Sequence, residues 1–394
     1  MTDRSVRFRM LTAATLCGAI FFDVGSNDAS SQQSQDHDRV VNLSSVTPTV
    51  PQVPVKRIER NTCRSCVIEL SPFASLSIPD SSGRLGAGDN WLTSDTQGRF
   101  FAYSADASGF GVFDPRGRLT ARVDLYDGDQ ADSAGIYSIL VGPGDSIFVY
   151  DGVRDQVTVF SSDLRFGRRF PLRLDDGKPR LFMGDLLLSV GGIRSPERVG
   201  YPLHLFNKVG DIVSSFGAQT SAFRPDVREL IEMREVTSAG PVSVWSGWWN
   251  QYRVERWNSS QRVVEIIERQ VEWFEPWWRL PRDESAAPVP ILVGLQQVGD
   301  TLLVLTRIAD RDWRLAAESA GGLSRVEDRD RVFDTMVEAI DLRKEGVIAT
   351  ARLPWMLFGF AGPGLVYGEA QVADGQILIP VWKLNTLSQS TRGD

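Results

Sequence analysis

Two cysteines form the clearest pair of reactive side chains in this sequence. Cys63 and Cys66 are separated by two residues, and the chain has one further cysteine. No third or fourth ligand lies nearby, so a zinc site is disfavoured. Val67 stands where a haem-attachment motif would need histidine, and no βαβ unit surrounds the pair as a redox motif would require. We therefore expect a structural disulfide that orders the chain locally, because so small a loop adds little stability.

Histidine and aspartate give little support for catalysis. The chain has two histidines, His37 and His204, whereas most general-base and zinc sites use histidine. Aspartates recur at similar turns, where several carboxylates together could hold a metal ion; they are Asp95, Asp145, Asp185 and Asp300. Because one residue type recurs at equivalent positions, a role in capping each turn is favoured. We predict no catalytic residues, no bound metal and no cofactor.

Tryptophan is unusually concentrated in one region. Seven of the eleven tryptophans lie between residues 245 and 278, and two adjacent pairs fall in predicted loops. Two adjacent indoles cannot easily both point inward, so the pairs could form an apolar surface for a protein, peptide or saccharide. The alternative is that the two loops pack on each other as a lid. The candidate binding residues are Trp248, Trp249, Tyr252, Arg253, Trp277, Trp278 and Arg279.

A recurring phrase shows which elements must position these residues. A glycine turn followed by a short apolar run occurs six times, beginning at Gly98, Gly144, Gly184, Gly240, Gly299 and Gly375. A tight turn before β-branched and aromatic residues indicates a hairpin. The spacing of 40 to 76 residues is the size of a blade with several strands. The sequence therefore predicts an all-β fold, a six-bladed β-propeller.

The blades can be placed along the chain, and the last one is incomplete. Five blades are predicted at about 91–125, 140–174, 181–216, 236–272 and 293–353, with 100–103 as the inner strand of the first. The last unit, 358–384, supplies about three strands. We expect residues 67–78 to supply the missing one, so that the N-terminal strand pairs with the C-terminal blade and closes the ring. Closure leaves no open sheet edge that could template aggregation.

The terminal segments indicate export. Three arginines precede the apolar stretch 10–22, which is too short for a membrane span of about 20 residues. We predict a signal peptide at 1–26, a disordered tether at 27–62, the propeller at 63–386 and a disordered tail at 387–394. The protein is expected to be periplasmic or extracellular, in contact with the membrane only through an uncleaved signal. A net charge of −7 argues against nucleic acid as a partner.

Several turn and strand phrases resemble a known superfamily. They span 94–99, 112–119, 141–151 and 157–164, and they resemble the TolB-like six-bladed propellers, in particular exported bacterial proteins related to NHL repeats. The resemblance covers roughly 64–386 and implies the fold. Members of the superfamily include ligand-binding scaffolds, interaction platforms, metal-dependent lactonases and peptide-modifying lyases, so the fold alone does not select an activity.

Two functions follow from these observations. The first is a monomeric, non-catalytic binding or interaction module that uses the loops 246–251 and 274–290 on one face, with a protein, peptide or saccharide as partner. The second is a metal-dependent hydrolase of the propeller lactonase type, with acidic ligands at the mouth of the central channel. A calcium ion in the channel would favour the hydrolase, and an exposed tryptophan surface would favour the binding module.

Overall fold

The computed structural model describes most of the chain beyond residue 52. The described residues are 53–59, 63, 66–79, 90–104, 108–126, 135–193, 195, 197–198, 200–217, 233–278, 286–320, 322–323, 326, 328–373 and 375–388. The predicted signal peptide 1–26, most of the predicted tether and residues 389–394 lie outside them. Every strand belongs to the compact unit Pro54–Asp394. None of the described helices is long and apolar enough to cross a membrane.

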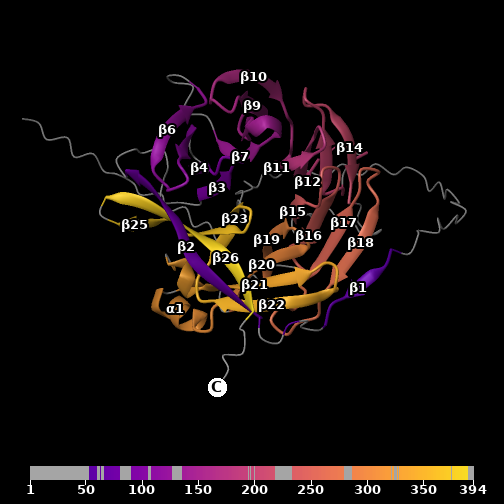
Figure 1. Ribbon diagram of the computed structural model, residues 1–394, viewed down its shortest axis with the longest axis vertical. Helices are drawn as coiled ribbons and strands as arrows, with labels where there is room; N and C mark the ends of the chain where they lie inside the picture. The colour runs from indigo at the N-terminus through magenta and orange to yellow at the C-terminus, as the bar shows by residue number, and fades with distance from the viewer. Residues whose placement is uncertain are drawn as a thin grey trace, which may run out of the picture. The chain divides into compact units, whose positions relative to one another are not determined.

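The strands form six sheets arranged as blades around one centre (Figure 1). The first three blades are plain four-stranded antiparallel meanders. Blade 1 contains β3 (Asn90–Ser94), β4 (Phe100–Ser104), β5 (Gly109–Phe113) and β6 (Leu119–Asp124). Blade 2 contains β7 (Ile136–Val141), β8 (Ile147–Asp151), β9 (Gln156–Phe160) and β10 (Phe166–Pro171), with the short helix η3 (Pro143–Asp145) in its first turn. Blade 3 contains β11 (Asp176–Met183), β12 (Leu186–Gly192), β13 (Leu203–Phe206) and β14 (Ile212–Phe216).

The last three blades carry additions to the same meander. Blade 4 contains β15 (Arg234–Ser238), β16 (Val244–Trp248), β17 (Arg253–Trp257) and β18 (Val263–Glu268), and β1 (Val55–Arg57) joins its edge. Blade 5 contains β19 (Ile291–Val298), β20 (Thr301–Ala309), β21 (Phe333–Asp341) and β22 (Gly346–Leu353), with α1 (Trp313–Ala320) and η5 (Arg329–Arg331) between β20 and β21. Blade 6 contains β23 (Leu357–Gly362), β24 (Leu365–Gly368), β26 (Gln376–Ser388) and β2 (Cys66–Pro79), with β25 (Gln371–Ala373) paired to β26.

The first strand of each blade lies nearest the centre. β3, β7, β11, β15, β19 and β23 contact one another in that order around the ring. The prediction of 100–103 as an inner strand is therefore wrong, because these residues form β4, the second strand of blade 1. Phe100 and Phe101 are both fully buried, one on each side of the blade. An apolar run is longest where both faces of a strand are covered, which made β4 easier to recognise than the more polar strand before it.

The N-terminal strand closes the ring as predicted. β2 is antiparallel to β26 over its whole length, with Leu76 opposite Ile379 and Ile78 opposite Ile377. Leu76 and Ile78 are fully buried among side chains of blades 6 and 1. β26 extends to Ser388, two residues beyond the expected end of the domain. The six-bladed propeller and its closure are thus confirmed.

A short strand before β2 was not expected. Residues Val55–Arg57, within the predicted tether, form β1 and pair in parallel with β18. Ile58 follows it and is buried in the cluster between blades 4 and 5, and its carbonyl accepts a bond from Arg269 Nη1 at 2.7 Å. Backbone pairing, one buried apolar side chain and the ion pairs of Lys56 with Glu265 and Glu345 hold this segment, so apolar density along the sequence could not reveal it.

Side-chain caps define the hairpin turns. Asp95 Oδ1 accepts hydrogen bonds from the backbone N–H groups of Gln97 and Arg99 at 3.0 and 2.9 Å. Gly98 adopts φ +76° in that turn, a conformation that glycine reaches without a steric cost. Asn258 caps the β17–β18 turn in the same way. The capping role predicted for Asp95 is confirmed, and these turns set where each strand begins.

Candidate binding face

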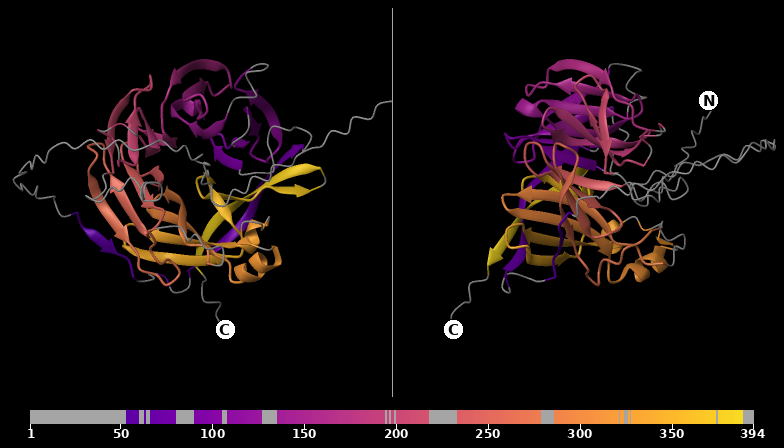
Figure 2. Two further views of the ribbon diagram at one scale, coloured as in Figure 1. Left: turned by 180° about the vertical axis from the view of Figure 1, so that it is seen from behind. Right: turned by 90° about the vertical axis from the view of Figure 1, so that its right-hand side faces the viewer.

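Each end of the propeller has a defined set of loops. Because every blade is the same meander repeated around one centre, the six innermost strands all begin at one end. We call that end the start face and the opposite end, which carries the turns between first and second strands, the turn face. The predicted loops 246–251 and 274–278 belong to the start face, as does α1, which projects from one end of the ring in Figure 2.

The recurring aspartates lie on the turn face and make separate contacts. Asp145 accepts bonds from Thr96 Oγ1 at 2.5 Å and from Thr96 N at 3.2 Å, and these bonds lower its pKa. Asp185 pairs with Lys208 at 3.3 Å, and Asp300 pairs with Arg343 at 2.7 Å. Among the described residues, no group of three or more His, Cys, Asp or Glu side chains could hold a metal ion. Asp145 therefore joins blade 2 to blade 1, whereas Asp185 and Asp300 each pair with another turn of their own blade. Side-chain capping bonds like those of Asp95 do not account for these three carboxylates.

His204 has a structural environment inside blade 3. Its side chain is fully buried, with Nδ1 2.8 Å from Ser215 Oγ and Nε2 3.0 Å from Gly191 O. The carbonyl can only accept, so Nε2 carries the proton and Nδ1 accepts from the serine. Burial lowers the pKa of His204 to about 4. The histidine is a neutral core residue at ordinary pH.

The first tryptophan pair lies beside charged residues of β15. Trp248 ends β16, and the guanidinium carbon of Arg234 lies 3.4 Å from the centroid of its ring. Trp249 follows and donates from Nε1 to Glu235 Oε1 at 3.3 Å. Both indoles are partly exposed. Both indoles of this pair therefore contact side chains of β15, the innermost strand of their own blade.

The second pair splits into one buried and one exposed indole. Trp277 is 7% exposed, and its Nε1 donates to Pro290 O at 2.6 Å. Its backbone also pairs with Asn250, through bonds of 3.1 Å to Asn250 O and 2.9 Å from Asn250 Nδ2. The two tryptophan loops thus pack on each other at Trp277. Trp278 is 57% exposed, so one indole of the second pair remains on the surface.

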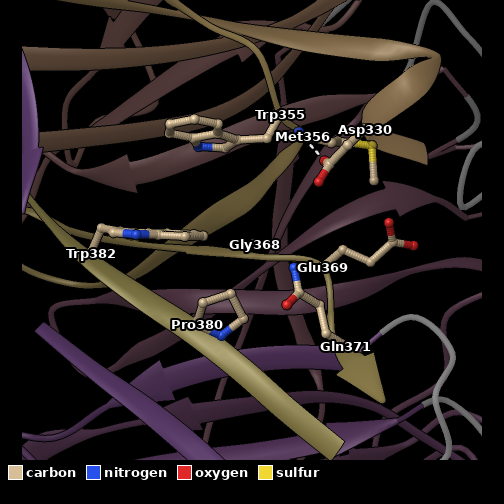
Figure 3. A pocket seen from close by; sticks show the side chains of 8 residues that line it. All are labelled: Asp330, Trp355, Met356, Gly368, Glu369, Gln371, Pro380 and Trp382. Atoms are coloured by element: carbon tan, nitrogen blue, oxygen red, sulfur yellow. Dashed lines mark hydrogen bonds between the residues drawn. The ribbon is translucent and has the colours of Figure 1, made fainter. Parts of the chain in front are cut away.

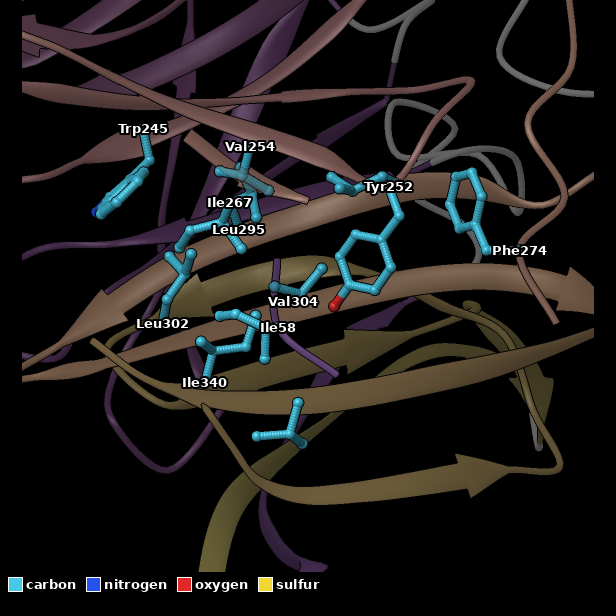
Figure 4. Close-up of a cluster of buried hydrophobic side chains, with 12 residues drawn as sticks. Ile58, Trp245, Tyr252, Val254, Ile267, Phe274, Leu295, Leu302, Val304 and Ile340 are labelled. Atoms are coloured by element: carbon cyan, nitrogen blue, oxygen red, sulfur yellow. The ribbon is translucent and has the colours of Figure 1, made fainter. Parts of the chain in front are cut away.

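The remaining predicted residues occupy different environments. Tyr252 is buried between blades 4 and 5, with its ring 5.7 Å from that of Phe274 (Figure 4). Its hydroxyl donates to Glu338, which Arg269 also holds through two bonds of 2.7 and 3.1 Å. Burial, followed by the Glu338 charge, raises the pKa of Tyr252 well above its usual value.

Arginine and cysteine complete the set of predicted residues. Arg253 pairs with Glu255 at 2.7 Å and with Glu268, so its charge is already matched. Arg279 lies outside the described residues. Cys63 and Cys66 are joined by a disulfide, with 5.5 Å between their Cα atoms.

Charged side chains near the centre of the start face were not anticipated. Arg180 of β11 forms an ion pair with Glu235 of β15, the same glutamate that accepts from Trp249. Lys178 Nζ lies 4.7 Å from the ring centroid of Trp91 on β3. We call this group the axial cluster: Trp91, Lys178, Arg180, Arg234, Glu235 and Trp249.

Two tyrosines affect the ionisation of Arg180 in the axial cluster. Burial lowers the pKa of Arg180, an effect that neighbouring Tyr103 and Tyr367 oppose. Burial also raises the pKa of Tyr103, with Tyr367 adding to the effect, and the Tyr103 ring stacks on Trp91 at 5.5 Å. Side chains from blades 1, 3 and 6 therefore meet near the centre.

The axial cluster combines basic side chains with indoles. It has three basic side chains and one carboxylate, and two of its cations lie over indole faces. A sequence signal for it exists, because Lys178 and Arg234 each stand six residues before a turn glycine, Gly184 and Gly240. The signal can be interpreted only when the innermost strand of each blade is known, and the apolar pattern predicted the second strand in its place.

Comparison with known proteins places the chain by its fold. No protein-family model matches the sequence, and no curated protein matches it either. The structure is similar to a member of the DUF4221 family from Bacteroides vulgatus, with a TM-score of 0.56 and 9% identity over 82% of this chain and 99% of that one. It is also similar to a Bacteroides fragilis protein named for its inferred export, with a TM-score of 0.53 and 12% identity over 83% of this chain and 99% of that one. At such identities the likeness establishes the fold alone, a six-bladed β-propeller.

Proposed function

We propose that this protein is an exported, monomeric six-bladed propeller that binds a partner through its start face without catalysing a reaction. The observation that carries the proposal is the meeting of the axial cluster and the Trp248–Trp249 turn at that end. Arginine and tryptophan are the residue types that most often dominate binding energy at interfaces. Here Arg180 of blade 3 and Trp249 of blade 4 share Glu235 as a partner, and Arg234 lies over the adjacent Trp248.

The charge and exposure of the start face indicate the kind of partner. Lys178 and Arg180 of the axial cluster are partly exposed near the centre of the start face, and basic side chains favour a partner that presents acidic groups. Trp278 and Leu315 of α1 are both more than half exposed at the same end, and exposed apolar side chains beside polar ones are typical of interaction sites. The proposed partner is therefore a protein or peptide with carboxylates next to apolar side chains.

Export is part of the same proposal. The basic and apolar residues of 1–26 support a signal peptide, and the Cys63–Cys66 disulfide suits an oxidising compartment. The Bacteroides fragilis neighbour is itself named for export. The six blades and the pairing of β2 with β26 also support kinship with the TolB-like and NHL-related propellers.

The proposal can be tested with peptides selected on the purified protein. Short peptides would be isolated from a displayed random library, and their affinities measured for the wild type and for two variants. Lys178→Gln removes a charge from the axial cluster, and Lys208→Gln removes the same charge from the turn face. We expect Lys178→Gln to weaken binding of acidic peptides at least tenfold, about 1.4 kcal/mol, with little effect from Lys208→Gln. Equal losses from both variants, or turnover of a lactone that requires a divalent cation, would contradict the proposal.

A further inference from the structure

A pocket separate from the axial cluster lies between the connections of blades 5 and 6. Its volume is about 170 Å³, and its walls come from η5, from the β22–β23 connection, from the residue after β24, and from β25 and β26 (Figure 3). At about 30 Å³ for each water molecule, this space suits the end of one side chain or a very small ligand. The lining side chains combine indoles with carboxylates.

One side of the pocket is aromatic. The rings of Trp355 and Trp382 are nearly parallel, at 23°, with their centroids 6.2 Å apart. Figure 3 shows both indoles on the side of the pocket opposite the carboxylates. Ring faces carry partial negative charge and attract cations within about 6 Å of a centroid.

The other side of the pocket is acidic. Asp330 accepts a bond from Met356 N at 2.6 Å, which fixes its carboxylate at the wall. Glu369 lies nearby, and its nearest cation is Arg329, whose Nε is 3.7 Å away. Asp328 adds a third carboxylate that influences Glu369. Among the described residues that line the pocket, Asp330 and Glu369 are acidic and none is basic, so ionisation of either carboxyl group gives the wall a negative charge.

Burial governs the protonation of this wall. It raises the pKa of Glu369 to about 7, with Asp330 and Asp328 adding to the effect and Arg329 opposing it. Burial also raises the pKa of Asp330. Burial away from water makes a carboxylate costly to ionise, so a cation that enters the pocket would stabilise the ionised form.

We propose that this pocket binds a primary alkylammonium group, with its methylene stem against Trp355 and Trp382 and its N–H donors toward Asp330 and Glu369. The pocket lies at the same end of the ring as the start face, but it belongs to blades 5 and 6 and shares no residue with the axial cluster or the Trp248–Trp249 turn. This proposal does not depend on those residues. The same ammonium chemistry is available from a free alkylamine and from a lysine side chain of a peptide. The volume of the pocket accommodates the head of either one.

Fluorine NMR of the full chain labelled with 5-fluorotryptophan provides a direct test. Each variant, Trp355→Phe or Trp382→Phe, lacks one fluorine resonance, and the missing resonance identifies the indole at that position. We expect n-butylamine to shift both resonances saturably at pH 8, whereas n-butanol, its neutral counterpart, leaves them in place. Equal shifts from both probes, or none from the amine, would overturn the proposal. Tighter binding of Nα-acetyl-lysine methylamide than of butylamine would point to a peptide lysine, and weaker binding to a free amine.

A charge variant and the pH dependence sharpen this test. Glu369→Gln should weaken butylamine binding about tenfold at pH 8, whereas Glu318→Gln on α1 changes the net charge equally and should have no effect. Since acid protonates Glu369 while the amine stays charged, wild-type affinity should fall about tenfold from pH 8 to pH 6. Glu369→Gln should remove most of that dependence. An unchanged pH profile in Glu369→Gln, or equal losses in both variants, would show that the carboxylate does not bind the amine.

Discussion

The ring closure can be tested through strand β2, because some of its side chains are buried between two blades and others are exposed. Leu76 and Ile78 are fully buried between blades 6 and 1. Replacing either with alanine should cost about 2–5 kcal/mol, because the lost burial is joined by a cavity that the rigid blades cannot close. The double variant should cost most of the roughly 5–15 kcal/mol that keeps a typical domain folded. The two sites share one cluster, so their effects need not add.

The control for this prediction lies in the same strand. Phe73 is 46% exposed, so Phe73→Ala should cost only about 1 kcal/mol despite the larger side chain removed. The free energy of unfolding would be measured by urea denaturation for the two single variants, the double variant and Phe73→Ala. A chain that begins at residue 82 should be insoluble or lack a cooperative transition, since it leaves the edge of β26 unpaired. If that shortened chain unfolds with the wild-type transition, the closure described here is wrong.

Three further predictions concern buried or cross-linked groups. The exported protein should show no free thiol at Cys63 or Cys66 until it is reduced, and reduction should lower the melting temperature only slightly; tight zinc found by elemental analysis would contradict this. Arg269→Met should destabilise the fold by about 3–5 kcal/mol in urea denaturation, because it leaves the buried Glu338 carboxylate without its cation; a neutral effect would show that the pair is not desolvated. The free energy of unfolding should fall by up to about 3 kcal/mol as pH falls from 6.5 towards 4, because the unfolded chain protonates His204 and the folded chain does not. If His204→Gln has the same dependence of stability on pH as the wild type, this prediction is wrong.

The fold was predictable because its signals are local. Turn residues such as Asp95 and Gly98 fix a hairpin within five positions, and the apolar runs after them are continuous because both faces of those strands are covered. The incomplete last unit then implied the pairing of β2 with β26. The prediction of which strand is innermost in a blade was wrong, because the innermost strand β3 is less apolar than β4.

The candidate site was predictable only in part, because it depends on contacts between distant segments. The spacing of Trp277 and Trp278 indicated that one indole would face outward, and it is Trp278 that does so. Sequence could not show that Tyr252 is buried against Glu338, which lies 86 positions away. The ion pair of Arg180 with Glu235 joins neighbouring blades in the same way.

Site-specific photocrosslinking in the native host cell tests most directly whether the start face is the binding surface. A benzophenone amino acid would replace Trp278 on the start face or Val209 in the β13–β14 turn at the opposite end. These side chains are 57% and 56% exposed, so both probes are equally accessible to a partner. The account predicts a discrete crosslinked product from position 278 and none from position 209. A product from position 209 alone would contradict it.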